Sequence, residues 1–177
     1  PTGNAVGPVM TDASGKLRVQ LYSLTAPAAL SGHNPTFGNF EVNVSHRAEE
    51  VCIGGGVVGA LAAPPPPNHN NGAFVVASYP NSDLSGWVGS TKDHGILFPH
   101  SIQVFAIGLT VVGMSRKDLI SHYIKVFTAE GERASWPEAT SAVDPGFTLL
   151  GGGFAVHSNE PAMGNMATRS FPLHTGA

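Results

Sequence analysis

Short apolar runs alternate along this chain with clusters of glycine, proline and polar residues. Residues 37–44 alternate between apolar and polar positions, as a strand with one buried face does. Residues 101–112 are almost continuously apolar, which predicts a strand covered on both faces. The same pattern predicts strands at residues 17–24, 37–44, 51–58, 73–77, 87–90, 101–112, 123–127, 147–156 and 166–171.

Many short strands joined by turns predict an all-β fold, arranged as an antiparallel sandwich, prism or barrel. One helical turn is expected at residues 115–123, because Ser115 is followed three residues later by Asp118. The apolar residues there have poor helical spacing, so no longer helix is predicted.

Two stretches of the chain resemble each other, which indicates a tandem repeat. Residues 51–58, Val-Cys-Ile-Gly-Gly-Gly-Val-Val, match residues 148–155, Thr-Leu-Leu-Gly-Gly-Gly-Phe-Ala. Residues 72–80 match residues 164–172, and both end in serine, an aromatic residue and proline. The first copy continues through Trp87 and an apolar strand, whereas the second has no counterpart of these, so we expect an incomplete repeat.

An incomplete repeat leaves the edge of its last strand open to pairing with another chain. Three arrangements could cover that edge: the N-terminal connector, a second subunit of a homo-oligomer, or a further part of a longer parent chain. The predicted organisation is an extended arm at residues 1–16, a first connector and core repeat at residues 17–114, and a second connector with the truncated repeat at residues 115–177. We expect one compact unit, with the arm either loose or exchanged with a neighbour.

The chain carries few charges for its size. Charged residues make up 12% of it and hydrophobic residues 42%, against about 25% charged residues in an ordinary soluble domain. This composition favours an assembled protein or one located outside the cell or on its surface. The net charge is −3 without any basic block, which argues against nucleic-acid binding. No apolar run reaches the roughly 18 residues of a membrane span.

The triple glycines lie between apolar residues and are followed neither by Lys-Ser nor by a helix. They therefore indicate close backbone packing or a bulge within strands rather than a phosphate-binding loop. A glycine would also let an aromatic ring, Trp87 or Phe105, lie flat on the sheet. Cys52 has apolar neighbours and is expected to be a buried structural thiol, with a reactive or intermolecularly paired thiol as the alternatives.

Asp93 and His94 are the weak catalytic candidates, since a carboxylate can orient an imidazole for base catalysis. Adjacent residues of a strand point to opposite faces, so the two would meet only in a turn, which they could equally serve to close. Eight histidines are scattered without ligand spacing. We therefore predict neither a metal site nor a cofactor.

A glycan-binding surface is the second candidate site. Trp136 lies in a polar connector, and its alternative role is to plug one end of the core. The other candidates lie in the loop at residues 64–71 and are Asn68, Asn70 and Asn71.

Four landmarks occur in a fixed order: the glycines at 54–56, the Ser-Tyr-Pro at 78–80, Trp87 and the Phe-Ala-Ile at 105–107. This order resembles β-rich repeat modules of uncharacterised bacterial secreted and cell-surface proteins. The resemblance covers residues 51–112 fully and 147–172 in part. It implies fold and location but no activity. In such modules a cysteine before the glycines pairs with one after the Ala-Ile step, where this chain has Gly108.

Three functions are consistent with these observations. The first is an extracellular structural or adhesive module that assembles itself by exchanging strands or arms. The second is a carbohydrate-binding module. The third is a glycan-acting hydrolase centred on Asp93 and His94.

Overall fold

A computed structural model gives the fold. It describes residues 4–5, 10–11, 17–26, 40–45, 48–61, 73–93, 100–157 and 164–172.

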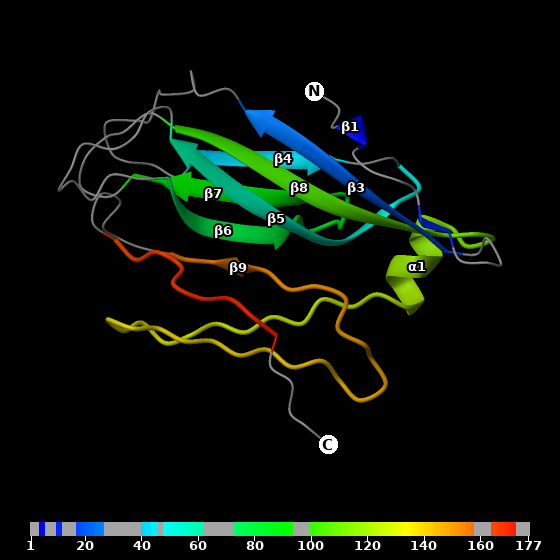
Figure 1. The fold of residues 1–177 in the computed structure, drawn as a ribbon. Helices are drawn as coiled ribbons and strands as arrows, with labels where there is room; N and C mark the ends of the chain where they lie inside the picture. Colours follow the sequence, from blue (N-terminus) through cyan, green and yellow to red (C-terminus); the bar gives the residue numbers. More distant parts are fainter. Residues whose placement is uncertain are drawn as a thin grey trace.

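Two antiparallel sheets and one short helix form the described part of the chain (Figure 1). The first sheet has the strand order β1-β3-β8-β5, and β2 also pairs with β3. Its strands are β1 (Asn4–Ala5), β2 (Met10–Thr11), β3 (Leu17–Ala26), β5 (Val51–Leu61) and β8 (His100–Val111). The second sheet has the order β4-β7-β6-β9, with β4 (Phe40–Ser45), β6 (Phe74–Pro80), β7 (Gly86–Lys92) and β9 (Phe154–Ala155). The β-rich antiparallel prediction is confirmed, and its barrel alternative is wrong, because neither sheet closes on itself.

The main core forms between β8, β5 and β7. Ile102, Val104 and Ala106 alternate along β8 and are fully buried, in one cluster with Trp87 and Cys52. Intervening residues of β8 are only half-buried, so its second face is less covered than its apolar sequence predicts. The period of two places every second side chain of β8 on the inner face.

Trp87 lies directly on the backbone of β5, as the glycines there predict. A Cβ added to Gly55 would lie 2.3 Å from Trp87 Cδ2 and 2.5 Å from the Phe105 carbonyl oxygen. The indole N–H donates to Ser78 Oγ at 2.9 Å, which satisfies its only donor inside the core. The register of β5 against β8 also shifts between Cys52 and Gly54, which is the expected irregularity at the glycines.

Strand predictions hold through residue 112 and fail beyond it. The six strands predicted before that point are all found, with ends displaced by at most three residues. No strand forms at residues 123–127 or 166–171, and the one predicted at 147–156 is reduced to β9. β9 pairs with β6 through Ala77 and Ser78. A strand forms only where a neighbour accepts its backbone hydrogen bonds, and beyond β9 the described residues of this region make only isolated bonds of this kind, such as those of Val156 and Ala167 with β6.

The helix α1 (Arg116–His122) begins at the predicted cap. Ser115 Oγ accepts from the Asp118 N–H at 3.1 Å and donates to Asp118 Oδ2 at 2.6 Å. The helix is longer than the single turn expected, because Leu119 is buried in a second cluster with Val51 and Leu84. That tertiary packing supplies stability that the local spacing lacks.

Two described parts of the predicted N-terminal arm, β1 and β2, pair with β3 of the same chain. The boundaries at residues 16 and 114 remain predictions. Among the residues the structure describes, no helix is both long enough and apolar enough to cross a membrane.

Candidate functional site

Asp93 contacts the buried side chain of His100. Asp93 Oδ1 lies 3.3 Å from His100 Nδ1, and His100 Nε2 lies 2.9 Å from Thr91 Oγ1. Thr91 and Asp93 are two residues apart, so they share one face at the end of β7, while His100 begins β8. This spacing is the signal in the sequence that could have identified the cluster. The other candidate, His94, lies outside the described residues.

The order hydroxyl, imidazole, carboxylate in this cluster is that of a nucleophilic triad. All three side chains are buried, so a substrate in solvent does not reach Thr91 Oγ1. The cluster connects the end of β7, in one sheet, to the start of β8, in the other sheet. A buried and paired polar network of this kind specifies how two elements meet.

Lys92 extends the same region toward the C-terminal part of the chain. Its Nζ donates to the carbonyl oxygen of Gly164 at 2.6 Å. Burial lowers the pKa of the Lys92 ammonium below its ordinary value, because removing the charge from water disfavours it. This contact fastens residues 164–172 to the end of β7.

Cys52 is the predicted buried structural thiol. It is 2% exposed, and its thiol donates to the Gly54 carbonyl oxygen, which lies 3.4 Å from Sγ. Burial raises the pKa of the Cys52 thiol to about 11, so the reactive thiolate is scarce at neutral pH. Its register partner across β5 and β8 is Gly108. The structure therefore places opposite Cys52 the residue that the module resemblance marks as the missing cysteine.

The variant Gly108→Cys is expected to form a disulfide with Cys52 under oxidising conditions and to raise the free energy of unfolding by about 2 kcal/mol. Directly opposed residues of an antiparallel pair lie at the separation a disulfide spans. Thiol titration and urea unfolding with and without reductant measure the bond and its effect. The control Gly108→Cys with Cys52→Ser reports any steric cost of the new side chain. Two free thiols in the oxidised variant would contradict the expectation.

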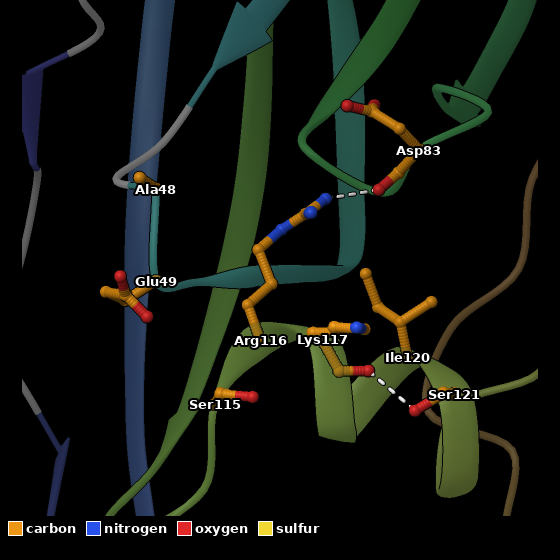
Figure 2. A pocket seen from close by; sticks show the side chains of 8 residues that line it. All are labelled: Ala48, Glu49, Asp83, Ser115, Arg116, Lys117, Ile120 and Ser121. Atoms are coloured by element: carbon orange, nitrogen blue, oxygen red, sulfur yellow. Dashed lines mark hydrogen bonds between the residues drawn. The ribbon is translucent and has the colours of Figure 1, made fainter.

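A cavity of about 590 Å³ lies between α1 and the turn that joins β6 to β7 (Figure 2). Arg116 crosses it, donating from Nε to the Glu50 carbonyl oxygen at 3.0 Å and from its terminal nitrogen to the Asp83 carbonyl oxygen. The Ser85 hydroxyl donates to Asp83 Oδ1 at 2.7 Å and lowers the pKa of Asp83 below its usual value. The residues that line the cavity are Ala48, Glu49, Asp83, Ser115, Arg116, Lys117, Ile120 and Ser121.

Charged side chains of both signs line this cavity. Arg116 donates hydrogen bonds to two backbone carbonyls, those of Glu50 and Asp83. Leu84, in the same turn, has a left-handed backbone with φ of 57° and is buried against Leu119. Its carbonyl also accepts from the Cys52 N–H at 2.8 Å. These contacts hold the helix to the sheets, which is a structural role.

Residues 123–157 and 164–172, which include β9, form an extended layer beside β6, called here the C-terminal layer (Figure 1). Lys125 Nζ contacts Asp144 Oδ2 at 2.6 Å, and the rings of Phe127 and Phe147 meet edge to face with centroids 5.5 Å apart. Arg169 pairs with Glu138. Side chains thus join segments that are distant in the sequence.

Eight large apolar side chains of this layer are exposed to solvent. Leu149, for example, is 51% exposed, whereas Cys52 at the matching position of the first copy is buried. The exposed large apolar residues of the layer are Tyr123, Val126, Trp136, Val143, Phe147, Leu149, Leu150 and Phe171. A folded chain rarely leaves so many together without a contact to make.

The backbone of the layer is equally open. Among the described residues from 125 to 153, a single backbone hydrogen bond is found, from the Phe147 N–H to the Asp144 carbonyl. Pairing resumes at β9, which pairs with β6, and continues at Val156, whose N–H donates to the Val76 carbonyl at 2.8 Å, and at Ala167, whose N–H donates to the Val75 carbonyl at 3.3 Å. The layer is therefore attached to β6 at one side and offers unpaired peptide groups elsewhere.

The second triple glycine makes the attachment possible. A Cβ on Gly151 would lie 2.4 Å from the Ile53 carbonyl oxygen, and one on Gly153 would lie 2.6 Å from the Ser78 carbonyl oxygen. The expected close backbone packing is confirmed at both glycines, although they do not lie within a strand. These glycines therefore let residues 151–153 pack directly on the backbone of β5 and β6.

Trp136, the predicted contact residue, is 84% exposed, so it does not plug the core. Asn68, Asn70 and Asn71, its predicted companions, lie outside the described residues. The sequence predicted an exposed position for Trp136 but did not predict the surrounding layer, and its role in binding stays a prediction. Leu149 and Leu150 belong to the strand predicted at residues 147–156, and the structure leaves both of them exposed and outside β9.

Within the described parts of the chain, no three His, Cys, Asp or Glu side chains gather in a group that could hold a metal ion. A scan against protein-family models, a search of curated proteins and a search of solved structures found no match to this chain.

Proposed function

We propose that this chain is an extracellular structural or adhesive β module that binds another protein surface through its C-terminal layer. The observation that supports this is the coincidence of exposed apolar side chains and unpaired backbone in one region. Apolar area gives association energy, and open peptide groups give a template for strand pairing. The low charge of the chain and its resemblance to secreted modules support an extracellular setting.

Retention on a phenyl-substituted matrix at high dilution tests whether the layer is an accessible contact surface. The native chain is expected to be retained, and Leu149→Asp to elute clearly earlier. Val58→Asp is the matched control, because Val58 is 50% exposed on β5, outside the layer. Both variants should unfold within about 0.5 kcal/mol of the native chain, since neither residue is in the core. Equal elution of Leu149→Asp and the native chain would refute the proposal.

A glycan-binding function is the second candidate, because the exposed Trp136 offers a flat ring on which a sugar can stack. On a glycan array, Trp136→Ala is expected to weaken any bound glycan about 10-fold, the effect of losing one stacking contact. The control Trp136→Phe keeps an aromatic face and should retain most of the binding. An array without a bound glycan, or an unchanged response of Trp136→Ala, would remove this candidate.

A further inference from the structure

We infer that the edge of β6, together with the adjoining backbone of β5, is a strand-acceptor site that binds the Gly-x-Gly segment of a second copy of this chain. In the structure, residues 151–156 of the same chain occupy this site. The inference goes beyond the proposed function, because the site lies on β5 and β6 and not on the exposed apolar side chains of the C-terminal layer. Addition of an extended segment to a sheet edge is a common mode of recognition.

The occupying segment is bound to β6 mainly through its backbone. Its strand β9 pairs with Ala77 and Ser78, and the Val156 N–H donates to the Val76 carbonyl at 2.8 Å. Neither Phe154 nor Val156 is fully buried, so their side chains add little to the attachment. Backbone hydrogen bonds do not depend on which chain carries the strand, and the segment of a second copy therefore makes the same contacts.

Two glycines of the segment determine which sequences fit the site. A Cβ on Gly151 would lie 2.4 Å from the Ile53 carbonyl oxygen, and one on Gly153 would lie 2.6 Å from the Ser78 carbonyl oxygen. A Cβ on Gly152 would meet no atom within 4 Å. Residues two apart in an extended segment face the same side, so the site requires glycine at two alternate positions and accepts other residues between them.

The second triple glycine does not repeat the role of the first. In the first copy the middle glycine, Gly55, is the one against which Trp87 packs. In the second copy the middle glycine faces open space, and the two outer glycines lie against the backbone of β5 and β6. The second copy is thus adapted to lie on the edge of a sheet and not to repeat the core position of the first.

The connection to the segment permits its exchange between copies. Residues 128–150 are all exposed, and the described residues 125–153 hold a single backbone hydrogen bond. The connection therefore contributes little to holding the segment on β6, and the segment can leave without disrupting the two sheets. Residues 164–172, which are attached to the same strand, would follow it. An exchanged element keeps its contacts and changes only the chain that supplies them.

A fluorescent peptide with the sequence of residues 148–157 tests the site by its anisotropy on the full chain. The native chain is expected to bind it weakly, because its own tethered segment competes at an effective concentration of about 1 mM. The full-chain double variant Gly151→Ala with Gly153→Ala should bind the peptide at least about 10-fold more tightly, since the new methyl groups displace its own segment.

The alanine at position 152 provides the matched control in both molecules. The full-chain variant Gly152→Ala should bind the peptide as weakly as the native chain does, because its own segment still fits. With the double variant as acceptor, a peptide carrying Gly152→Ala should bind like the native peptide. A peptide carrying Gly151→Ala and Gly153→Ala should bind at least about 10-fold more weakly. Circular dichroism and the emission of Trp87 show that each full-chain variant folds, and Gly153→Ala alone is the milder replacement for the double variant.

Disulfide trapping tests whether a second copy supplies the segment. Ala77 and Ala155 are register partners, so the full-chain variants Ala77→Cys and Ala155→Cys, mixed at about 1 mM and oxidised, should yield a heterodimer cross-linked between positions 77 and 155. Ala77 is 6% exposed, which suppresses cross-links from chance collisions. Ala77→Cys mixed with Val58→Cys is the control, and it should give no heterodimer, because Val58 is exposed but lies outside the segment.

Equal binding of the native and the doubly substituted peptides to the double variant would overturn the acceptor site, and so would a double variant that binds the native peptide no better than the native chain does. A mixture that forms no cross-link between positions 77 and 155, or one that cross-links position 58 equally well, would overturn the exchange between copies. Neither assay involves Leu149, so retention on the phenyl-substituted matrix reports on the proposed function separately.

Discussion

The variant Asp93→Ala is expected to unfold with a free energy lowered by about 4 kcal/mol, the largest single-residue effect predicted for this chain. Asp93 and His100 are both fully buried and 3.3 Å apart, so removing the carboxylate leaves the imidazole in the interior without its charged partner. Urea unfolding followed by far-ultraviolet circular dichroism measures the loss. A cost below about 1 kcal/mol would show that the pair does not hold β7 and β8 together.

A double-mutant cycle separates the pair from the packing around it. Asp93→Ala combined with His100→Leu should cost less than the sum of the two single variants by more than about 1 kcal/mol, because each single variant already loses the contact between the two side chains and the double variant loses it only once. Thr91→Val is the matched smaller change, since it keeps the shape and removes only the hydroxyl that lies 2.9 Å from His100. Its expected cost is about 1 kcal/mol. Additive single costs would contradict a direct interaction.

The variant Gly55→Ala is expected to lower the free energy of unfolding by about 3 kcal/mol and the melting temperature by roughly 6–12 °C. The new methyl would lie 2.3 Å from Trp87 Cδ2 and 2.5 Å from a backbone carbonyl oxygen, and neither can yield without moving the core. Thermal unfolding measures the change, and the emission of Trp87 should shift to longer wavelength as the ring is displaced toward water.

Gly56→Ala is the matched control for this change. It alters the next residue of the same strand, but a Cβ at Gly56 meets no atom within 4 Å. Its stability should stay within about 0.5 kcal/mol of the native value. If both alanine variants lost the same stability, the cause would be the backbone of β5 and not the contact with Trp87.

Much of the structure up to the end of α1 was predictable, because it depends on residue types and their neighbours in the sequence. The cap at Ser115 depends on a hydroxyl and an N–H three residues apart, so two residue types identified it. The burial of Cys52 followed from its apolar neighbours. The glycines predicted that an aromatic ring, Trp87 or Phe105, lies on them, and the structure shows that it is Trp87 on Gly55. The partner of Asp93 was missed because the chain between Asp93 and His100 links two different sheets, and the course of such a connection is not encoded locally.

The pattern of apolar and polar residues, by itself, predicted the β character and the strands up to residue 112, because short alternating or apolar runs between turn residues suit extended segments of a sheet. The same pattern could not determine whether residues 148–155 form a strand. Residues 51–58 and 148–155 carry the same pattern, yet the first lies within β5 and the second contributes only β9. The tertiary structure decided between them, because a strand needs a neighbour that accepts its hydrogen bonds. β8 provides one for the first copy, and only β6, over a few residues, does so for the second.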